Sequence, residues 1–275
     1  MTTLFTNVTA LRMDEDFTTL RQGFVAVDGT HISYVGPDHP QGTFDQTIDC
    51  TGKVMMPGFV NCHTHIPMTL MRGYGGGHDL QSWLQDFIFP AEDRWDDRSL
   101  AAATGLGLAE MIASGVTCIA DMYMRPGVIA RQALDAGISA NLSVGAVYFG
   151  RPEDFSPDTC EDCENHVRLY EDWHNAGDGQ IQVDASIHAE YTSCAPAWEW
   201  VAGFAQRHGL GMHVHISETQ KEHEECLNKY GSTPIQLLNR YGVWDTRAIA
   251  AHCVYTTPED WALMVQKGVS CVHNP

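Results

Sequence analysis

The sequence predicts an α/β fold: a (β/α)8 barrel of the TIM type that follows a small N-terminal β module. From Pro57 onward, apolar strand-like runs alternate with helical patterns, which is typical of a parallel β/α architecture. The first 55 residues instead hold short strand-like runs separated by turns. We therefore predict a β module over residues 1–56 and the barrel over residues 57–275.

The composition is that of a chain that buries a substantial core: of 275 residues, 44% are hydrophobic and 19% are charged. The 16 Lys and Arg against 35 Asp and Glu give a formal charge of −19, which repels phosphate backbones and anionic lipid surfaces. We therefore expect neither nucleic acid nor a membrane as partner. No apolar run approaches the roughly 18 residues of a membrane span, and the N-terminus lacks a secretory signal pattern, so we expect a cytoplasmic protein.

The nine cysteines are irregularly spaced and lie mostly inside apolar segments, which is typical of reduced, buried thiols. Cys160 and Cys163 form a C-x-x-C pattern, but no second pair nearby completes a four-sulfur zinc site. We interpret this pair as the start of a helix or as a loop, and not as a metal or redox site.

The β module is predicted from four strand-like runs, with Asp28-Gly29 and Gly36-Pro37 supplying turns. A module of this size is too small to bury a core alone. The predicted strands are residues 4–10, 23–28, 31–36 and 47–49.

The barrel is predicted from seven strand-like runs separated by helices with recognisable ends. Glycines such as Gly137 and Gly268 precede strands, where a left-handed residue ends the preceding helix. Thr233-Pro234 and Thr257-Pro258 place a hydroxyl N-cap before a proline at the first helical position. The predicted strands are residues 58–62, 116–122, 138–148, 181–188, 211–215, 248–252 and 269–273.

A (β/α)8 barrel closes with eight strands, and a barrel of seven strands leaves two edges with unpaired N–H and C=O groups. We therefore expect residues 1–275 to be part of a longer protein whose next segment supplies the eighth strand.

Two histidines, His63 and His65, end the first predicted barrel strand. Residues i and i+2 of a strand point to the same face, so both imidazoles can bind one metal ion at ~2.0–2.1 Å. The alternative is a pair of hydrogen-bonded core histidines, but it must explain why they lie at the carboxyl end of a strand, where barrels hold their active sites. We predict that both are metal ligands.

A second pair, His213 and His215, ends the strand predicted over residues 211–215. Alternation puts both on one face, but only the one nearer the strand's end reaches a site above the barrel. We therefore predict His215 as the third ligand and His213 as a packed, hydrogen-bonded residue. Glu218 can swing over the same cavity as a proton carrier; the alternative is a solvated carboxylate at a helix start.

Two further histidines, His188 and His252, end other predicted strands and face the same cavity. We predict that His252 polarises water or a substrate carbonyl and that His188 contacts the substrate, although a strand-end histidine can also simply bond a loop carbonyl. His273 is expected to organise a turn. The remaining histidines are predicted to be solvated, in loops or on helix faces: His31, His39, His78, His166, His174, His208 and His223.

Together these residues resemble the metal-dependent amidohydrolase superfamily, and within it the branch of methylthioadenosine/S-adenosylhomocysteine deaminases and related chlorohydrolases. The resemblance runs over essentially the whole chain in the right order. It is carried by Pro57-Gly58-Phe59-Val60-Asn61-x-His63-x-His65, Met71-Arg72-Gly73-Tyr74, Trp83-Leu84, Pro90-Ala91-Glu92, His215-x-x-Glu218, Ala251-His252-Cys253 and His273-Asn274-Pro275.

The resemblance implies one catalytic divalent metal ion, usually zinc and sometimes iron, held by His63, His65, His215 and an aspartate that ends the eighth strand. Asp121, near the end of the second strand, is not expected to take the place of that aspartate. The resemblance also implies that the β module belongs to a small β-sandwich that gains strands from a C-terminal tail. Proteins of this superfamily are commonly dimeric or larger.

The implied activity is hydrolysis of carbon–nitrogen bonds other than peptide bonds: a metal-activated water displaces ammonia from an amino-substituted purine or nucleoside. Glu218 would protonate the adjacent ring nitrogen, and His252 would help to hold and polarise the water. By the same resemblance, Glu92 contacts ribose hydroxyls and His188 approaches the base or sugar. Without the aspartate, residues 1–275 alone are expected to have severely reduced catalytic activity.

Two alternatives to this substrate class stay open. The protein could act on another amino-substituted heterocycle, such as guanine, a pterin or a triazine. It could also be a catalytically silent barrel that lacks the fourth metal ligand and serves as a scaffold.

Overall fold

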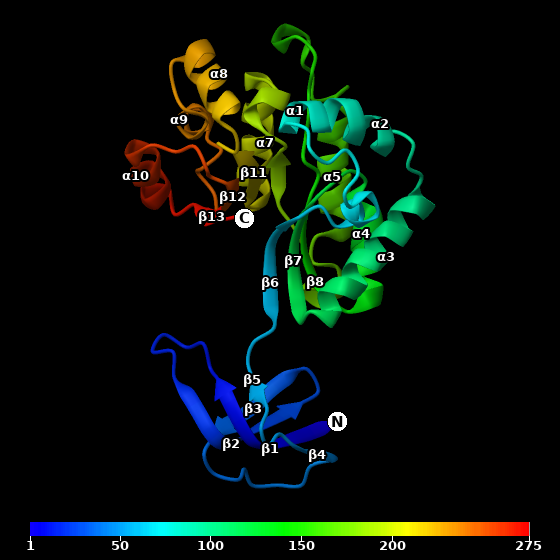
Figure 1. Cartoon of the computed structure of the whole chain (residues 1–275), viewed down its shortest axis with the longest axis vertical. Coiled ribbons are helices and arrows are strands. Elements are labelled where there is room, and N and C mark those ends of the chain that lie inside the picture. Colours follow the sequence, from blue (N-terminus) through cyan, green and yellow to red (C-terminus); the bar gives the residue numbers. More distant parts are fainter. Residues whose placement is uncertain (275) are drawn as a thin grey trace. The chain divides into compact units, whose positions relative to one another are not determined.

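The computed structural model describes residues 1–274 and divides into two compact units, Met1–Phe59 and the residues from Val60 onward. Figure 1 labels most of the helices and strands of the two units. Among the described residues, no helix combines the length and the apolar character that crossing a membrane requires.

The first unit is one five-stranded sheet. Its strands are β1 (Thr2–Leu11), β2 (Thr19–Asp28), β3 (His31–Gly36), β4 (Gln46–Asp49) and β5 (Val54–Met55). The order is β3-β2-β1-β4, with β5 also paired to β1; β2 runs antiparallel to β1 and β3, whereas β4 and β5 run parallel to β1. Four strands coincide with predicted runs, and β5 is too short to give a sequence pattern. Its small core is formed by Val8, Ala10, Val25 and Cys50.

The second unit holds the strands of a parallel β/α barrel. Its described residues form two four-stranded sheets, β6-β7-β8-β9 and β10-β11-β12-β13, and a parallel bridge from Ala146 to Ile187 links the two. β9 and β10 are two parts of one predicted strand, so the strands occupy the seven predicted positions. The strands are β6 (Phe59–Thr64), β7 (Val116–Met122), β8 (Ser139–Ser143), β9 (Ile181–Val183), β10 (Ala185–Ile187), β11 (Met212–Ile216), β12 (Ala248–His252) and β13 (Ser270–Val272).

The strand predicted over residues 138–148 is the one that differs most from the structure. Regular pairing ends at Ser143, and Gly145 adopts a φ of 71° that a strand cannot accommodate. The apolar character of the following residues serves to line a cavity instead, as Val147 does.

The interruption between β9 and β10 is occupied by Asp184, which is buried and ties neighbouring strands together. Its carboxylate accepts hydrogen bonds from the Gly211 N–H at 2.9 Å, Asn141 Nδ2 at 2.6 Å and Arg247 Nη2 at 2.6 Å. Gly211 and Arg247 directly precede β11 and β12, so this network lies at the amino ends of those strands. A Cβ at Gly211 would lie 2.7 Å from Asp184 Oδ1, which explains the glycine.

The helix ends follow the sequence predictions. Gly137 and Gly268 end α4 and α10 with φ angles of 73° and 65°, and Thr233 and Thr257 accept backbone N–H groups as N-caps of α9 and α10. Cys160 directly precedes α5, which confirms the interpretation as a helix start. The main helices are α3 (Asp97–Ala113), α4 (Pro126–Ala136), α5 (Glu161–Trp173), α7 (Ala195–His208), α8 (Gln220–Tyr230), α9 (Pro234–Asn239) and α10 (Pro258–Lys267).

Short helical segments lie between these elements, and several carry residues of the site. They are η1 (Ile66–Met71), α1 (Leu80–Ser82), the π-helical η2 (Trp83–Ile88), α2 (Phe89–Glu92), η3 (Pro152–Asp154), α6 (Ala176–Gly179) and η4 (Glu190–Thr192).

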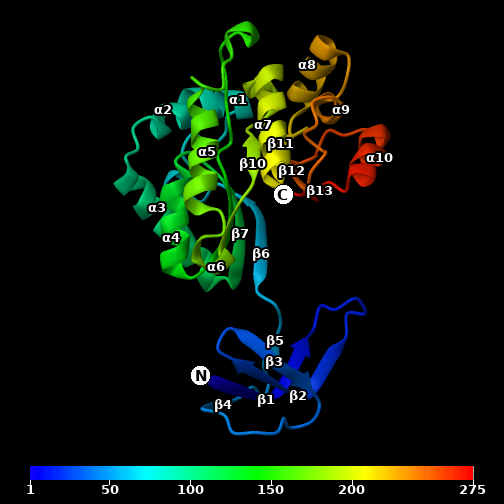
Figure 2. The same ribbon diagram turned by 180° about the vertical axis from the view of Figure 1, so that it is seen from behind.

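The helices cover the strands and enclose the core of the second unit. Figures 1 and 2 show α3, α4 and α5 side by side on one side of the second unit. α3 contacts β7, α4 contacts β8 and α5 contacts β9. The core between the layers contains two fully buried tryptophans, Trp198 on α7 and Trp244 after α9. The layers thereby fix the carboxyl ends of the strands, where the candidate site lies.

Candidate metal centre

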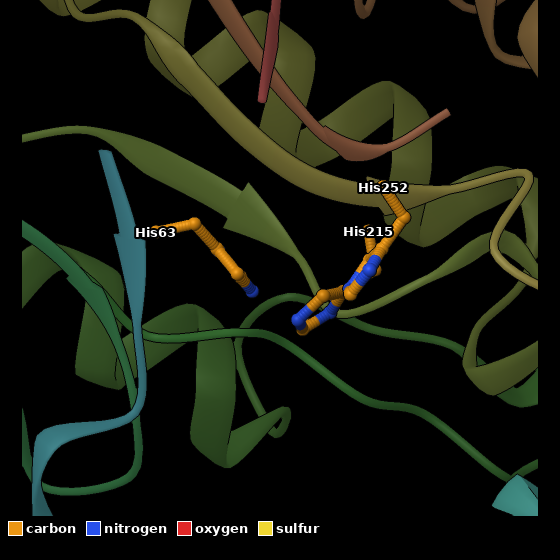
Figure 3. Close-up of side chains that lie close together, drawn as sticks. All are labelled: His63, His215 and His252. Atoms are coloured by element: carbon orange, nitrogen blue, oxygen red, sulfur yellow. The ribbon is translucent and has the colours of Figure 1, made fainter. Parts of the chain in front are cut away.

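Histidines from several strands meet at the carboxyl ends of the barrel strands. One ligand atom from each of His63 (β6), His215 (β11) and His252 (β12) can be chosen so that all three lie within 4.8 Å of one another. Figure 3 shows these three side chains turned towards a common space. His65 directly follows β6 and His188 follows β10. We call the space bounded by these five residues the histidine cup.

The Nε2 atoms of His65 and His215 lie 3.1 Å apart. His65 Nδ1 lies 2.5 Å from the Met122 carbonyl oxygen, and His215 Nδ1 lies 2.8 Å from the His188 carbonyl oxygen. A carbonyl can only accept, so each Nδ1 carries the hydrogen and each neutral ring keeps a lone pair on Nε2. Two lone pairs therefore face each other, an arrangement that a shared cation stabilises.

A chain of hydrogen bonds fixes the tautomer of His63, which also carries its hydrogen on Nδ1. His63 Nδ1 lies 2.8 Å from His213 Nε2, His213 Nδ1 lies 3.4 Å from Ser143 Oγ, and Ser143 Oγ donates to the Asp121 carbonyl at 3.3 Å. Because the chain ends on a carbonyl, each neutral group donates to the next, and His63 is left with its lone pair on Nε2. His213 is fully buried, so it packs and positions His63.

Burial keeps the imidazoles of the cup neutral. The pKa of His63 is lowered to about 2, mainly because the ring is buried and also because other histidines lie close to it. The pKa values of His188 and His252 fall to about 4, and that of His215 falls well below its usual range, again mainly through burial. Neutral imidazoles can bind a metal ion without first losing a proton.

The residues present fit a divalent zinc or iron ion. Imidazole nitrogen suits both metals, and an N···N separation near 3 Å matches two ligands of one ion with bonds of ~2.0–2.1 Å. Sequence reasoning selects His63, His65 and His215 as ligands, and the structure brings all three to the cup. The three ligand atoms that lie within 4.8 Å of one another belong to His63, His215 and His252. His252 therefore lies within reach of the same ion, although the sequence did not predict it as a ligand.

The cup opens into a cavity of about 990 Å³, which Glu218 also lines. Glu218 Oε2 lies 3.7 Å from His252 Nε2. Burial, followed by the charge of Glu222, raises the pKa of Glu218 to about 7. A carboxyl group with its pKa in this range is well suited to transfer protons near neutral pH.

The two residues predicted to contact substrate, Glu92 and His188, also line the cavity. Glu92 ends α2, is buried, and accepts a hydrogen bond from the Tyr123 hydroxyl at 2.5 Å. Burial raises the pKa of Glu92. Sequence reasoning missed Tyr123, although its place directly after β7 is the signal that identified the strand-end histidines.

Backbone strain marks two of the strand ends. Ser217 and His252 have φ angles of 53° and 79°, in the left-handed region that residues other than glycine rarely adopt. Such conformations cost of order 1–3 kcal/mol each and gather at functional sites. Here they turn the chain sharply beside His215 and Glu218.

Residues outside the cup complete the comparison with the predictions. Asp121 does not line the cavity; it accepts the Ile66 N–H at 2.6 Å and so holds the backbone next to His65. His273 is exposed. The prediction that His166 is solvated is wrong: it is 1% exposed, and its Nε2 accepts the Ser186 N–H at 3.0 Å. The partner comes from another element, so the helix pattern gave no sign of it.

Comparison with known proteins gives concordant results. Residues 54–275 match the sequence model described as the amidohydrolase family. A protein of Thermoanaerobacter pseudethanolicus named 5-methylthioadenosine/S-adenosylhomocysteine deaminase is 34% identical over 275 residues, which cover 100% of this chain and 63% of that protein. One of the same name from Desulfitobacterium hafniense is 37% identical over 264 residues, covering 95% and 59%. The chain spans roughly three-fifths of the length of these relatives.

Solved structures agree with this assignment. An adenosine deaminase from Xanthomonas campestris with bound zinc has a TM-score of 0.88 and 29% identity, covering 99% of this chain and 62% of that chain. An atrazine chlorohydrolase from Arthrobacter aurescens complexed with zinc has a TM-score of 0.87 at 21% identity, covering 98% and 65%; this likeness concerns the fold alone. The fold is thus of the TIM-barrel type. With its histidine cup and the match over residues 54–275, this chain belongs to the amidohydrolase family.

Proposed function

We propose that the protein is a metal-dependent hydrolytic deaminase of an amino-substituted purine or nucleoside, of the methylthioadenosine or S-adenosylhomocysteine type. One observation carries the proposal: the Nε2 lone pairs of His65 and His215 face each other in the cavity that also contains Glu218. The names of the relatives support this substrate class. Because the chain covers roughly three-fifths of those relatives, the proposal concerns the activity of the whole protein.

In this proposal His63, His65 and His215 hold the metal ion through their Nε2 atoms, with His252 beside them. A bound divalent ion lowers the pKa of a coordinated water from 15.7 towards ~7 and so supplies a nucleophile at neutral pH. The backbone carbonyls of Met122 and His188 keep two of the rings in the required tautomer.

Glu218 supplies the proton transfers. Its carboxyl group lines the cavity beside His252, and its raised pKa keeps a proton available near pH 7. When water adds to the ring carbon that bears the amino group, the adjacent ring nitrogen gains electron density, and Glu218 would donate its proton there. A proton lost by the water would pass to the amino group, the C–N bond would break, and ammonia would leave. His252, whose ligand atom lies within 4.8 Å of those of His63 and His215, would hydrogen-bond the attacking water and hold it in place.

Glu92 and His188 bind the remainder of the substrate. The Tyr123 hydroxyl occupies Glu92 Oε1, which orients the carboxyl group and leaves its other oxygen for a ribose hydroxyl. His188 faces the His215 ring at 4.7 Å between centroids, where it can contact the base or sugar.

Ammonia release tests the proposal. The natural full-length protein and residues 1–275 are loaded with Zn²⁺ and given 5′-methylthioadenosine, S-adenosylhomocysteine, adenosine, guanine and a triazine in parallel. We expect the full-length protein to release ammonia fastest from the thioether nucleosides. A preference for guanine or the triazine would move the assignment to another heterocycle, and release from no compound by a metal-loaded protein would favour a silent scaffold.

A further inference from the structure

Behind the histidine cup lie two buried carboxyl groups that the proposed chemistry does not use. Glu190 is 3% exposed and belongs to η4, and Glu222 is 2% exposed and belongs to the first turn of α8. Two buried acids in contact are costly unless each has partners, so their contacts indicate what they do.

Glu222 binds the backbone of the segment that carries Glu218. Its Oε1 accepts the Ser217 N–H at 2.6 Å, and its Oε2 accepts the N–H groups of Glu218 at 2.7 Å and Thr219 at 3.3 Å. Three consecutive N–H groups thus converge on one carboxylate. The segment contains the left-handed Ser217, whose conformation needs such support.

This arrangement exceeds ordinary helix capping, as α10 of the same chain shows. There Thr257 and Asp260 form the same capping box, but Asp260 accepts only one of the preceding backbone N–H groups, that of Thr257 at 2.9 Å. Its other oxygen accepts the Thr233 hydroxyl at 2.6 Å and Gln236 Nε2 at 3.0 Å. Capping alone therefore requires one N–H, and Glu222 holds three.

Glu190 brings a proton to this group. Burial, followed by the charge of Glu222, raises the pKa of Glu190, which favours a proton on one of these two carboxyl groups. Glu222 is surrounded by N–H donors and keeps the charge. Glu190 has one oxygen without a hydrogen-bond partner, which a neutral acid tolerates far better than an anion, so Glu190 carries the proton.

We propose that Glu222 is a positioning residue that clamps residues 217–219 and thereby aims Glu218 into the histidine cup. The role of Glu218 in this inference rests on the proposed function, whereas the clamp itself does not.

Substitutions of the two acids give an asymmetric test. Glu190→Gln leaves the three backbone N–H contacts of Glu222 in place and should preserve the clamp. Glu222→Gln turns an NH2 group towards backbone N–H groups and should break it. The matched control is Glu225→Gln, the same change on the exposed face of α8. We expect amide hydrogen exchange at residues 217–219 to accelerate at least about 10-fold in Glu222→Gln alone.

Two outcomes would overturn the clamp. One is unchanged exchange at residues 217–219 in a folded Glu222→Gln variant. The other covers the case in which that variant does not fold. Glu222→Asp keeps the charge but shortens the side chain to that of Asp260 in α10, so it should accelerate exchange at residues 217–219, and unchanged exchange there contradicts the proposal.

A kinetic measurement separates the clamp from the proposed function. With a substrate that the unsubstituted protein deaminates, Glu222→Gln should lower kcat about 10-fold with KM unchanged and with full metal content. Equal loss of metal would show that Glu222 only supports the fold, which would overturn the positioning role. Absence of ammonia release from the unsubstituted protein would count against the proposed function, and hydrogen exchange would still decide on the clamp.

Discussion

His65 and His215 face each other through Nε2 atoms 3.1 Å apart, while both rings donate their Nδ1–H groups to backbone carbonyls. Neither ring can then donate to the other, so two lone pairs repel across the cup unless a cation lies between them. The carbonyls thereby orient both rings as the proposed function requires of two metal ligands.

Zinc binding is the first expected consequence. Zn²⁺ should raise the thermal midpoint of unfolding, because a ligand at 100 times its Kd stabilises the folded state by about 2.7 kcal/mol. His215→Ala should lose most of this shift, whereas His31→Ala, in an exposed position of the first unit, should keep it. Thermal unfolding with and without chelator measures the effect, and an equal shift in both variants would contradict the ligand assignment.

His213 should act on the metal through His63. His213→Leu removes the acceptor for His63 Nδ1–H and should weaken zinc binding about 10–100-fold, the usual effect of losing a residue that orients a ligand. His213→Gln can place an amide oxygen near the position of Nε2 and should recover part of the affinity. Competition with a chromophoric chelator gives the affinities; identical values for Leu and Gln would argue against the hydrogen-bond chain.

Glu218 should be needed for turnover and not for metal binding. Glu218→Gln keeps the shape of the side chain but cannot transfer a proton, so ammonia release should fall about 10²–10⁴-fold. Metal content, measured by elemental analysis, should stay unchanged. The assignment fails if the variant retains full activity.

Gly211 should be essential for packing at the amino ends of the strands. In Gly211→Ala the added Cβ would lie 2.7 Å from Asp184 Oδ1 and 2.9 Å from the Arg247 carbonyl oxygen. Such overpacking typically costs about 1–3 kcal/mol. Gly105→Ala in α3 is the control, since its Cβ would meet only Gln132 Oε1 at 3.6 Å and should leave stability unchanged or raised. Urea unfolding of both variants tests the contrast.

The buried acid pair should make stability depend on pH. Burial, followed by the charge of Glu222, raises the pKa of Glu190 from 4.5 to about 9. Between these values the folded chain keeps a proton that the unfolded chain has released, so the free energy of unfolding decreases as pH rises. Glu190→Gln should remove this contribution, at most about 1.4 kcal/mol per pH unit. Urea unfolding between about pH 5 and 9 measures the difference in slope, and parallel profiles would contradict it.

Local pattern was enough to predict much of the fold and the cup. His63 and His65 could be paired because alternate residues of a strand share a face, and the strand positions followed from apolar runs between capped helices. The Glu190–Glu222 contact could not be foreseen in this way. It joins elements more than thirty positions apart, and which side chains meet there depends on how the helix packs and not on any spacing in the sequence.

The Asp184 network lies at the amino ends of β11 and β12, and the cup lies at their carboxyl ends. The contacts that align these strands therefore lie at the opposite end of the strands from the candidate site. We therefore expect that the loops around the opening of the cavity can be exchanged or lengthened while the strands keep their alignment. Engineering for a different heterocycle should begin with these loops and leave Asp184 unchanged.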